Sequence, residues 1–278
     1  MGIANGAAVN FSRHAYAIQF SVMSAAVLWQ SLTWEEIAGL RAAGMDAALL
    51  PVGATEQHGP HLATSVDSVT AERLAHAVSG ETGVPVLPTL HYGCSLGHSR
   101  RWPGTLALQP QTLIGLIVEI GEWAYYSGVR RLIMINGHVT NFAPLRCALE
   151  VLRSRFDDLL VAIRNVADVS PRVRTEFDAD AADWHANAAE TSLMLHLAPE
   201  LVRTDRLAEA RDPDRTGGLF FAHPVNRTSR NGVTGDPGAS SAADGLSLFT
   251  RMVADLAEQV RAALREKPPL DQSYFATI

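Results

Sequence analysis

Acidic and imidazole side chains follow a short apolar stretch in the first quarter of the chain. Residues Ala47 to Val52 are apolar and end at a Pro/Gly turn, which predicts a short buried strand. Glu56 and His58 come directly afterwards, and their spacing of two directs both side chains to one side of an extended segment. Carboxylate oxygen and imidazole nitrogen together suit Zn²⁺ or Mn²⁺. We therefore expect a metal site beyond the end of this strand.

Three later residues are candidates to complete that site, and each has an ordinary alternative. Asp67 lies where a helix is expected to begin, so it is either a helix cap or a ligand. His138 follows the apolar run 131–135 on an Asn-Gly-His turn, where it is either a turn histidine or a ligand. Glu190 lies on a predicted helix, 183–197, among leucines. A carboxylate buried there is costly without a partner, so Glu190 faces solvent or meets a cation.

The elements that must position these residues alternate between strand and helix patterns. Strands are expected at 47–52, 84–88, 131–135 and 159–163, and helices at about 33–43, 67–79, 111–127, 141–155, 183–197 and 242–264. This alternation predicts a single α/β domain with a mostly parallel sheet and helices on both faces. Ligands of such sheets bind beyond the carboxyl ends of the strands, where Glu56, His58 and His138 are expected.

The ends of the chain and one long segment lack such patterns. Residues 1–28 are expected to be an extension, disordered at its start, and the domain is expected to span 29–278. Part of that extension, 15–29, is a weak match to a signal peptide that Gln19 interrupts, so export is the less favoured alternative. Residues 203–238 are rich in Gly, Pro, Asn and Arg, and are expected either to close over the site or to form a subunit contact.

Composition excludes several classes of function. The chain has 278 residues, enough for one large core, and a net charge of -6 without any basic block. This balance argues against nucleic-acid or membrane-surface partners. Its two cysteines are too few for a disulfide framework, so we expect a reducing, cytoplasmic location. The sequence also shows no Gly-x-Ser-x-Gly on the strand–turn–helix that serine hydrolases use.

A set of motifs resembles the creatininase (creatinine amidohydrolase) family over about residues 32–264. They are Pro51 to His61 with Asp67, Pro103-Gly104-Thr105, Asn136-Gly137-His138, Glu190-Thr191-Ser192 and Gly235-Asp236-Pro237. The resemblance implies a creatininase-like fold and two divalent ions, Zn²⁺ and/or Mn²⁺. By motif, Glu56 and His138 would hold one ion, His58 and Glu190 the other, and Asp67 would bridge them.

The same resemblance implies the chemistry. His185 matches the family's catalytic histidine and would pass a proton from the metal-bridging water to the leaving nitrogen. Its alternative is a histidine at a helix start without a role. We expect an amidohydrolase that uses a metal-bridging hydroxide to cleave a non-peptide C–N bond of a small amide, cyclic amides included. The alternatives are a related hydrolase of a formamide or a short peptide end, and a catalytically silent, metal-stabilised binding protein.

Departures from the family pattern bear on the substrate. Thr140 stands where creatininase has a metal-binding glutamate. Trp184 directly precedes His185, whereas creatininase has its tryptophan further upstream. Creatinine is therefore an improbable substrate. Candidates for the pocket wall are His98, Arg100, Arg101, Trp102 and Trp184. Stacking and paired hydrogen bonds from these residues would favour a flat or anionic substrate. The alternative is that these residues only pack at the surface and do not line a pocket. The expected partner is a small-molecule amide, and the resemblance implies a homo-oligomer, with a hexamer as one form.

Overall fold

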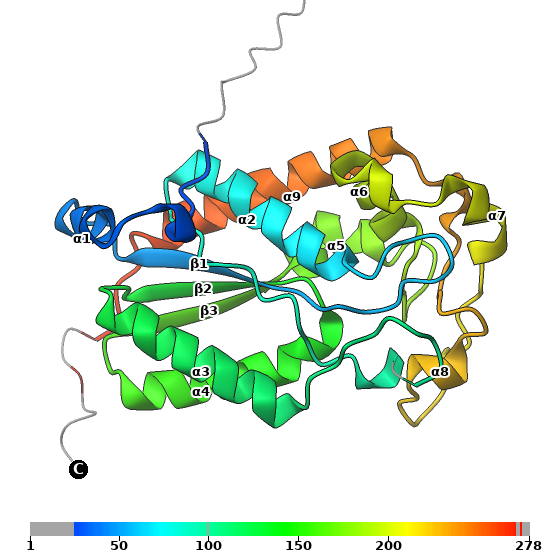
Figure 1. Cartoon of the computed structure of the whole chain (residues 1–278), viewed down its shortest axis with the longest axis horizontal. Coiled ribbons are helices and arrows are strands. Elements are labelled where there is room, and N and C mark those ends of the chain that lie inside the picture. Colours follow the sequence, from blue (N-terminus) through cyan, green and yellow to red (C-terminus); the bar gives the residue numbers. More distant parts are fainter. Residues whose placement is uncertain (1–24, 99, 271–272, 274–278) are drawn as a thin grey trace, which may run out of the picture.

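Three parallel strands form the centre of the molecule. The computed structural model describes residues 25–98, 100–270 and 273. Its sheet contains β1 (Ala47–Val52), β2 (Arg131–Asn136) and β3 (Leu160–Asn165) in that order (Figure 1). The register pairs Val52 with Asn136 and Asn136 with Asn165, so all three strands end at one edge. This topology confirms the predicted parallel sheet.

Helices cover both faces of the sheet, as Figure 1 shows. The long ones are α2 (Val66–Thr82), α3 (Pro110–Tyr126), α4 (Phe142–Arg155), α6 (Ala188–Leu197) and α9 (Ala242–Ala263). Successive strand residues point to opposite faces, so Ala47 and Leu49 of β1 pack in the cluster that includes α2 and α9. Ala48 and Leu50 pack instead in the cluster that includes α3 and α4. The predicted α/β class with two covered faces is confirmed.

Shorter elements complete the chain. They are α1 (Trp34–Ala42), α5 (Pro171–Phe177), α7 (Leu207–Ala210), α8 (Val225–Thr228) and the 3₁₀ turns Trp29–Ser31, Leu96–His98, Val139–Asn141, Val166–Asp168, Pro199–Leu201, Thr204–Arg206 and Pro237–Ala239. The capping box expected at α1 is present: the Thr33 hydroxyl accepts from the Glu36 amide, and the Glu36 carboxylate accepts from the Thr33 amide. No helix among the described residues is long and apolar enough to span a bilayer.

The segment 84–88 differs from its predicted strand. Val86 makes only isolated parallel bridges, to Leu28 and Leu49, because Pro85 and Pro88 have no amide hydrogen to continue a ladder. The segment nevertheless covers the outer edge of β1. Leu28 thereby belongs to the folded domain, whereas residues 1–24 of the predicted extension lie outside the described residues.

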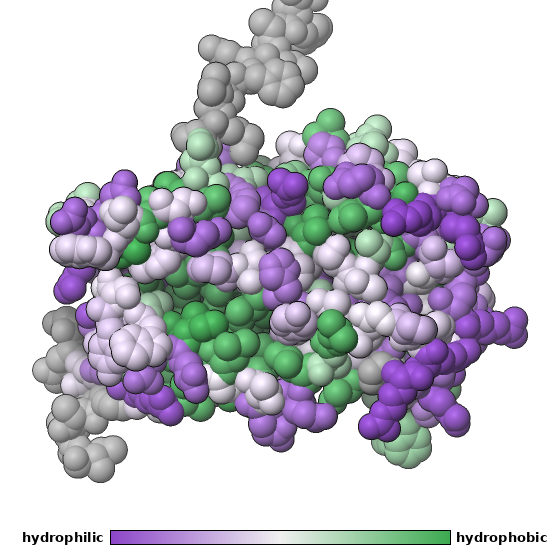
Figure 2. All heavy atoms as spheres, viewed as in Figure 1, coloured by the Kyte–Doolittle hydropathy of each residue, from purple (hydrophilic) through white to green (hydrophobic). Residues whose placement is uncertain are grey.

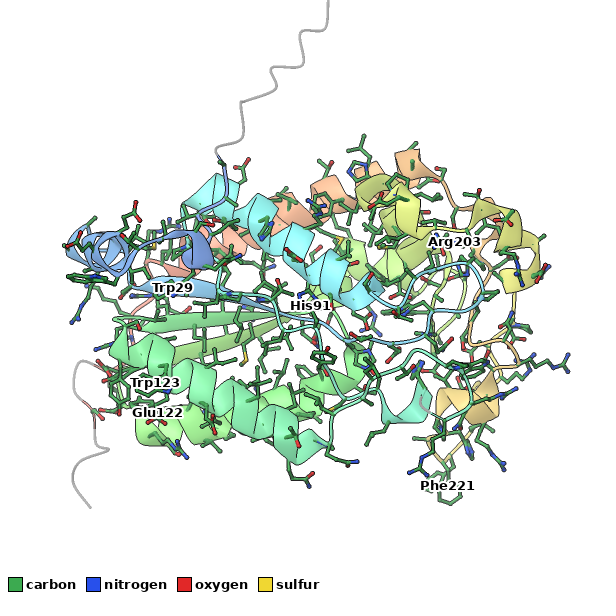
Figure 3. All side chains as sticks on the ribbon, viewed as in Figure 1. Trp29, His91, Glu122, Trp123, Arg203 and Phe221 are labelled. Carbon is green, nitrogen blue, oxygen red and sulfur yellow. The ribbon has the colours of Figure 1, made fainter. Side chains whose placement is uncertain are left out.

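An apolar area lies beside this edge on the face shown in Figure 2. Trp29, Leu90, Leu116, Ile120 and Trp123 border a hollow of about 430 Å³ there. Figure 3 shows Trp29 and Trp123 at the same end of the sheet. None of the predicted metal ligands is among the lining residues, so this hollow is separate from the site described next.

Candidate metal centre and active site

The five side chains predicted as metal ligands meet beyond the carboxyl edge of the sheet, and all are buried. They form two groups, Glu56/Asp67/His138 and His58/Asp67/Glu190, and Glu56 and His58 form a third with His185; the potential ligand atoms within each group lie within 4.8 Å of one another. Asp67 belongs to the first two groups: Oδ1 is 3.4 Å from His58 Nε2, and Oδ2 is 3.4 Å from His138 Nδ1. A carboxylate that offers one oxygen to each of these two groups has the geometry of a bridging ligand.

A glycine lets the His138 turn approach Asp67. Asp67 lies in the first turn of α2, and a Cβ atom on Gly137 would lie 2.2 Å from the Asp67 carbonyl oxygen. Only glycine therefore permits the chain leaving β2 to pass this close to α2. The turn is stabilised by Asn136, whose side chain donates to the His138 carbonyl (2.8 Å) and accepts from the His138 amide (3.2 Å).

Glu190 is oriented by the start of α6. Asn187 caps this helix by accepting from the Glu190 amide at 3.2 Å. Ala186 has a left-handed backbone (φ 51°) that directs its amide to Glu190 Oε2 at 2.6 Å. The other oxygen, Oε1, faces His58 Nε2 at 3.8 Å. One oxygen of Glu190 is thus held by the backbone, and the other faces the site.

Hydrogen bonds assign the tautomers of the two histidine ligands. His58 Nδ1 donates to the Glu56 carbonyl at 3.0 Å, so Nε2 is the nitrogen that faces Asp67. The Thr140 hydroxyl donates to the Cys94 carbonyl, so its oxygen accepts from His138 Nε2. That leaves the His138 Nδ1 lone pair toward Asp67, while Nε2 also lies 3.2 Å from Glu56 Oε2. Each imidazole is therefore held by one nitrogen and presents the other to the site, as metal-binding histidines do.

His185 lies before α6 and not within a helix, which corrects the predicted helix start at 183. Backbone hydrogen bonds with Thr234 hold it in an isolated antiparallel bridge, at 3.0 and 2.8 Å. Its Nε2–H donates to the Gln57 carbonyl at 2.9 Å, and Nδ1 lies 3.6 Å from Glu56 Oε1. Burial, together with the neighbouring His98 and His58, lowers the pKa of His185 well below its usual value. A neutral imidazole with Nδ1 toward the site is positioned to accept a proton.

Several buried polar atoms at the centre are satisfied poorly by the protein itself. Among the described residues, Glu56 Oε1 and Oε2, His58 Nε2 and Asp67 Oδ2 have no hydrogen-bond partner. Burial raises the pKa of Glu56 to about 7, although the nearby His138 opposes that shift. Burial disfavours a charged His58, but Asp67 and Glu190 raise the pKa of His58 well above its usual value. Three buried carboxylates, two of them with unpartnered oxygens, fit divalent cations, which would replace the missing partners.

The predicted pocket residues separate into two sets. His98 and Trp184 border the cavity of about 170 Å³ that opens onto the ligands. Arg100, Arg101 and Trp102 do not line it, and Arg101 is occupied elsewhere: its guanidinium donates to the Asn226, Ser229 and Arg230 carbonyls and lies 4.7 Å from the centre of the Trp102 ring. Arg101 therefore connects two loops, and the paired anion contact expected of it has no support here.

Other residues at the site were not expected from sequence. The Gln57 side chain contacts His98 and His185 and donates to the Gly232 carbonyl at 3.1 Å. Strand alternation would have pointed Gln57 away from its neighbours, but the segment that follows β1 is irregular, so three successive side chains are buried. His223 to Val225 line the cavity, and this part of the 203–238 segment therefore lies over the site. Phe221, a few residues earlier, points away from the domain (Figure 3).

Comparison with known proteins adds to this geometry. The family model for creatininase, described as creatinine amidohydrolase, matches residues 30–260. The chain belongs to the creatininase family. A creatinine amidohydrolase of Pseudomonas putida is 32% identical over 264 residues, 89% of this chain and 100% of the relative. A mycofactocin precursor peptide peptidase of Mycolicibacterium smegmatis is 34% identical over 227 residues, 77% of this chain and 83% of the relative.

Solved creatininase structures have the same fold. A manganese form has a TM-score of 0.77 and 28% identity, and the match covers 87% of this chain and 100% of that one. A Zn–Zn form has the same TM-score and identity over 87% and 99%. The predicted resemblance is therefore confirmed, and the chain is a hydrolase of this family whose relatives include metal-bound enzymes.

Proposed function

We propose that this protein hydrolyses an amide C–N bond with the help of two divalent ions, Zn²⁺ and/or Mn²⁺. The observation that carries the proposal is the position of Asp67 between two groups of buried ligands. Glu56 and His138 would complete one ion site, and His58 and Glu190 the other. The unpartnered atoms of Glu56, His58 and Asp67 support this assignment, because each would gain a partner when ions bind.

The bound ions would polarise the amide carbonyl and lower the pKa of an attacking water. The chain's own contribution to proton transfer is His185. Because Nε2–H is committed to the Gln57 carbonyl, Nδ1 is the atom that takes the proton from water. The same Nδ1 then returns the proton to the leaving nitrogen as the C–N bond breaks, so the imidazole ends the cycle neutral. The depressed pKa of His185 favours that return.

Two kinds of substrate are consistent with the relatives. One is a compact amide of the size of creatinine, which the Pseudomonas relative's name indicates. The other is the end of a peptide, which the name of the mycobacterial relative indicates. Thr140 and Trp184 make creatinine itself an unfavourable choice, because Thr140 contributes a hydroxyl to His138 and not a carboxylate to the site.

Metal analysis together with two variants tests the proposal. Purified protein should contain close to two Zn or Mn per chain, and His138→Ala should lose bound metal and activity. His185→Ala should keep the metal and lose about 10²-fold or more in turnover. A matched control is His76→Ala, because His76 lies on α2 and is partly exposed. Normal turnover by His185→Ala would refute the proton transfer, and metal-loaded protein that cleaves no amide would favour the silent binding protein.

A further inference from the structure

A second cavity of about 240 Å³ adjoins the one that opens onto the ligands. The two cavities have five lining residues in common: Gly137, His138, Val139, Asp183 and Trp184. The second extends past the carboxyl ends of β2 and β3, where Asn136 and Asn165 border it. The two cavities thus adjoin and together make up a cleft with the predicted ion sites at one end.

The wall of the second cavity is mostly apolar. Its apolar lining side chains are Val139, Phe142, Val166, Ala167, Ala182 and Trp184. Val139 and Phe142 are 63% and 42% exposed, so a molecule in the cavity would cover apolar surface that now faces solvent. Trp184 is held in place, because its indole N–H donates to Asp178 at 3.1 Å and its ring lies 5.0 Å from that of Phe177. The cavity therefore has a preformed wall for an apolar group.

The charged groups around this cavity do not favour an anion. Arg174, the guanidinium that lines it, already donates to Asp178 at 2.6 Å. The carboxylates of Asp168 and Asp183 also border it, and Asp183 lies where the two cavities meet. A negatively charged group of the substrate would be repelled by these carboxylates, whereas a neutral apolar group would not.

The volume of the cavity at the ligands also favours a substrate that extends into the second cavity. Small-molecule sites commonly occupy about 300 to 1,000 Å³, and the cavity at the ligands, with about 170 Å³, is below that range. A compact cyclic amide would fill the first cavity alone and leave the apolar wall of the second one exposed. A substrate that extends from the scissile amide into the second cavity would use both.

We infer that the second cavity is a substrate subsite for an apolar side chain next to the scissile amide, so that the substrate is a peptide end and not a compact cyclic amide. This inference rests on the proposed hydrolysis of an amide bond. It assigns Val139, Phe142 and Ala182 to specificity, because they shape the subsite without taking part in bond cleavage.

Three uncharged N-acetyl dipeptide amides test the inference with metal-loaded enzyme: Gly-Gly, Phe-Gly and Gly-Phe. One of the two phenylalanine peptides should be cleaved between its residues with a kcat/KM at least about 10-fold above that of Gly-Gly, the gain expected when a phenyl ring is buried. Creatinine and hydantoin should be cleaved more slowly than that peptide. Equal rates for all three peptides would overturn the inference.

Two substitutions separate the subsite from the rest of the cleft. Ala182→Trp fills the cavity from an exposed turn, and Phe142→Ala removes part of its wall, so each should reduce the ratio of the Phe-peptide to the Gly-Gly rate by about 3-fold or more. Ala243→Trp, on an exposed position of α9, should leave that ratio unchanged. Metal content of each variant reports whether it has folded.

The outcomes distinguish the inference from the proposed function. Hydrolysis of hydantoin or creatinine without hydrolysis of the peptides would overturn the subsite but retain the amide hydrolase. Cleavage of none of these compounds by protein with two bound ions would count against both. A Phe-peptide preference that Ala182→Trp does not reduce would place the apolar group elsewhere in the cleft and overturn the assignment.

Discussion

Replacing Thr140 by Val should weaken metal binding although Thr140 is not itself a ligand. Valine has nearly the same shape but no hydroxyl, so His138 Nε2–H would lose the oxygen that now accepts from it. The imidazole would then be free to turn or to change tautomer, and Nδ1 would no longer be directed at Asp67. Hydrogen-bond partners of ligating histidines typically contribute about 10- to 100-fold in metal affinity.

The structure places the expected loss at the lower end of that range. After the substitution, Nε2 would still have Glu56 Oε2 at 3.2 Å, and the Cys94 carbonyl and the Ser95 hydroxyl at 3.3 Å. These contacts are longer than an ordinary hydrogen bond, so they would compensate only in part. We expect a loss of about 10-fold, equivalent to about 1.4 kcal/mol of binding free energy.

Competition with a chromophoric chelator measures this affinity for Zn²⁺ and Mn²⁺ directly. Thr140→Ser keeps the hydroxyl and should restore most of the affinity, which distinguishes the hydrogen bond from a general packing effect. Unchanged affinity in Thr140→Val, or an equal loss in Thr140→Ser, would refute the assignment of Nδ1 as the His138 ligand atom.

The remaining predictions concern stability. Gly137→Ala should lower the free energy of unfolding by about 1–3 kcal/mol in urea denaturation, because its Cβ would meet the Asp67 carbonyl at 2.2 Å; Gly115→Ala in α3, where nothing lies within 4 Å, should be neutral or stabilising. Chelation should lower the melting temperature, since the proposed ions would bind the folded chain, and an unchanged value would contradict the metal sites. Burial, with the charge of His58, lowers the pKa of His61 to about 4, so between pH 6.5 and 4 the unfolded chain binds a proton that the folded chain does not. As the pH is lowered from 6.5 to 4, the free energy of unfolding should therefore decrease by on the order of 3 kcal/mol. His61→Asn should reduce this pH dependence in denaturation curves. An equal pH dependence in both proteins would show that His61 titrates normally.

Local sequence patterns predicted most elements of the fold because those elements depend on local periodicity. The apolar runs of β1 and β2 and the capping box at Thr33 appear where they were expected. Glu56, Asp67 and His138 were recognisable because each follows or begins such an element. Their convergence follows from parallel strands in register, whose carboxyl ends lie at one edge of the sheet.

Other parts of the site depend on contacts between distant segments, which leave no local pattern. His185 pairs with Thr234, 49 positions later, and this pairing prevents the helix from starting at 183. The three carbonyls that Arg101 binds lie more than 120 positions away, so its basic character alone indicated an anion site. The second cavity is formed by side chains from several turns, and nothing in any one of them predicts a cavity.

The pairing of His185 with Thr234 divides the active site between two parts of the scaffold. The proposed ligands Glu56, His58 and His138 follow strands of the sheet, whereas the imidazole proposed to transfer the proton depends on a loop that also pairs Gly235 with Asp212. Substitutions in that loop can therefore shift the imidazole relative to a bound substrate while the ion sites keep their arrangement. Such a division would allow related proteins to change their substrate through substitutions in loops while the proposed metal ligands stay unchanged.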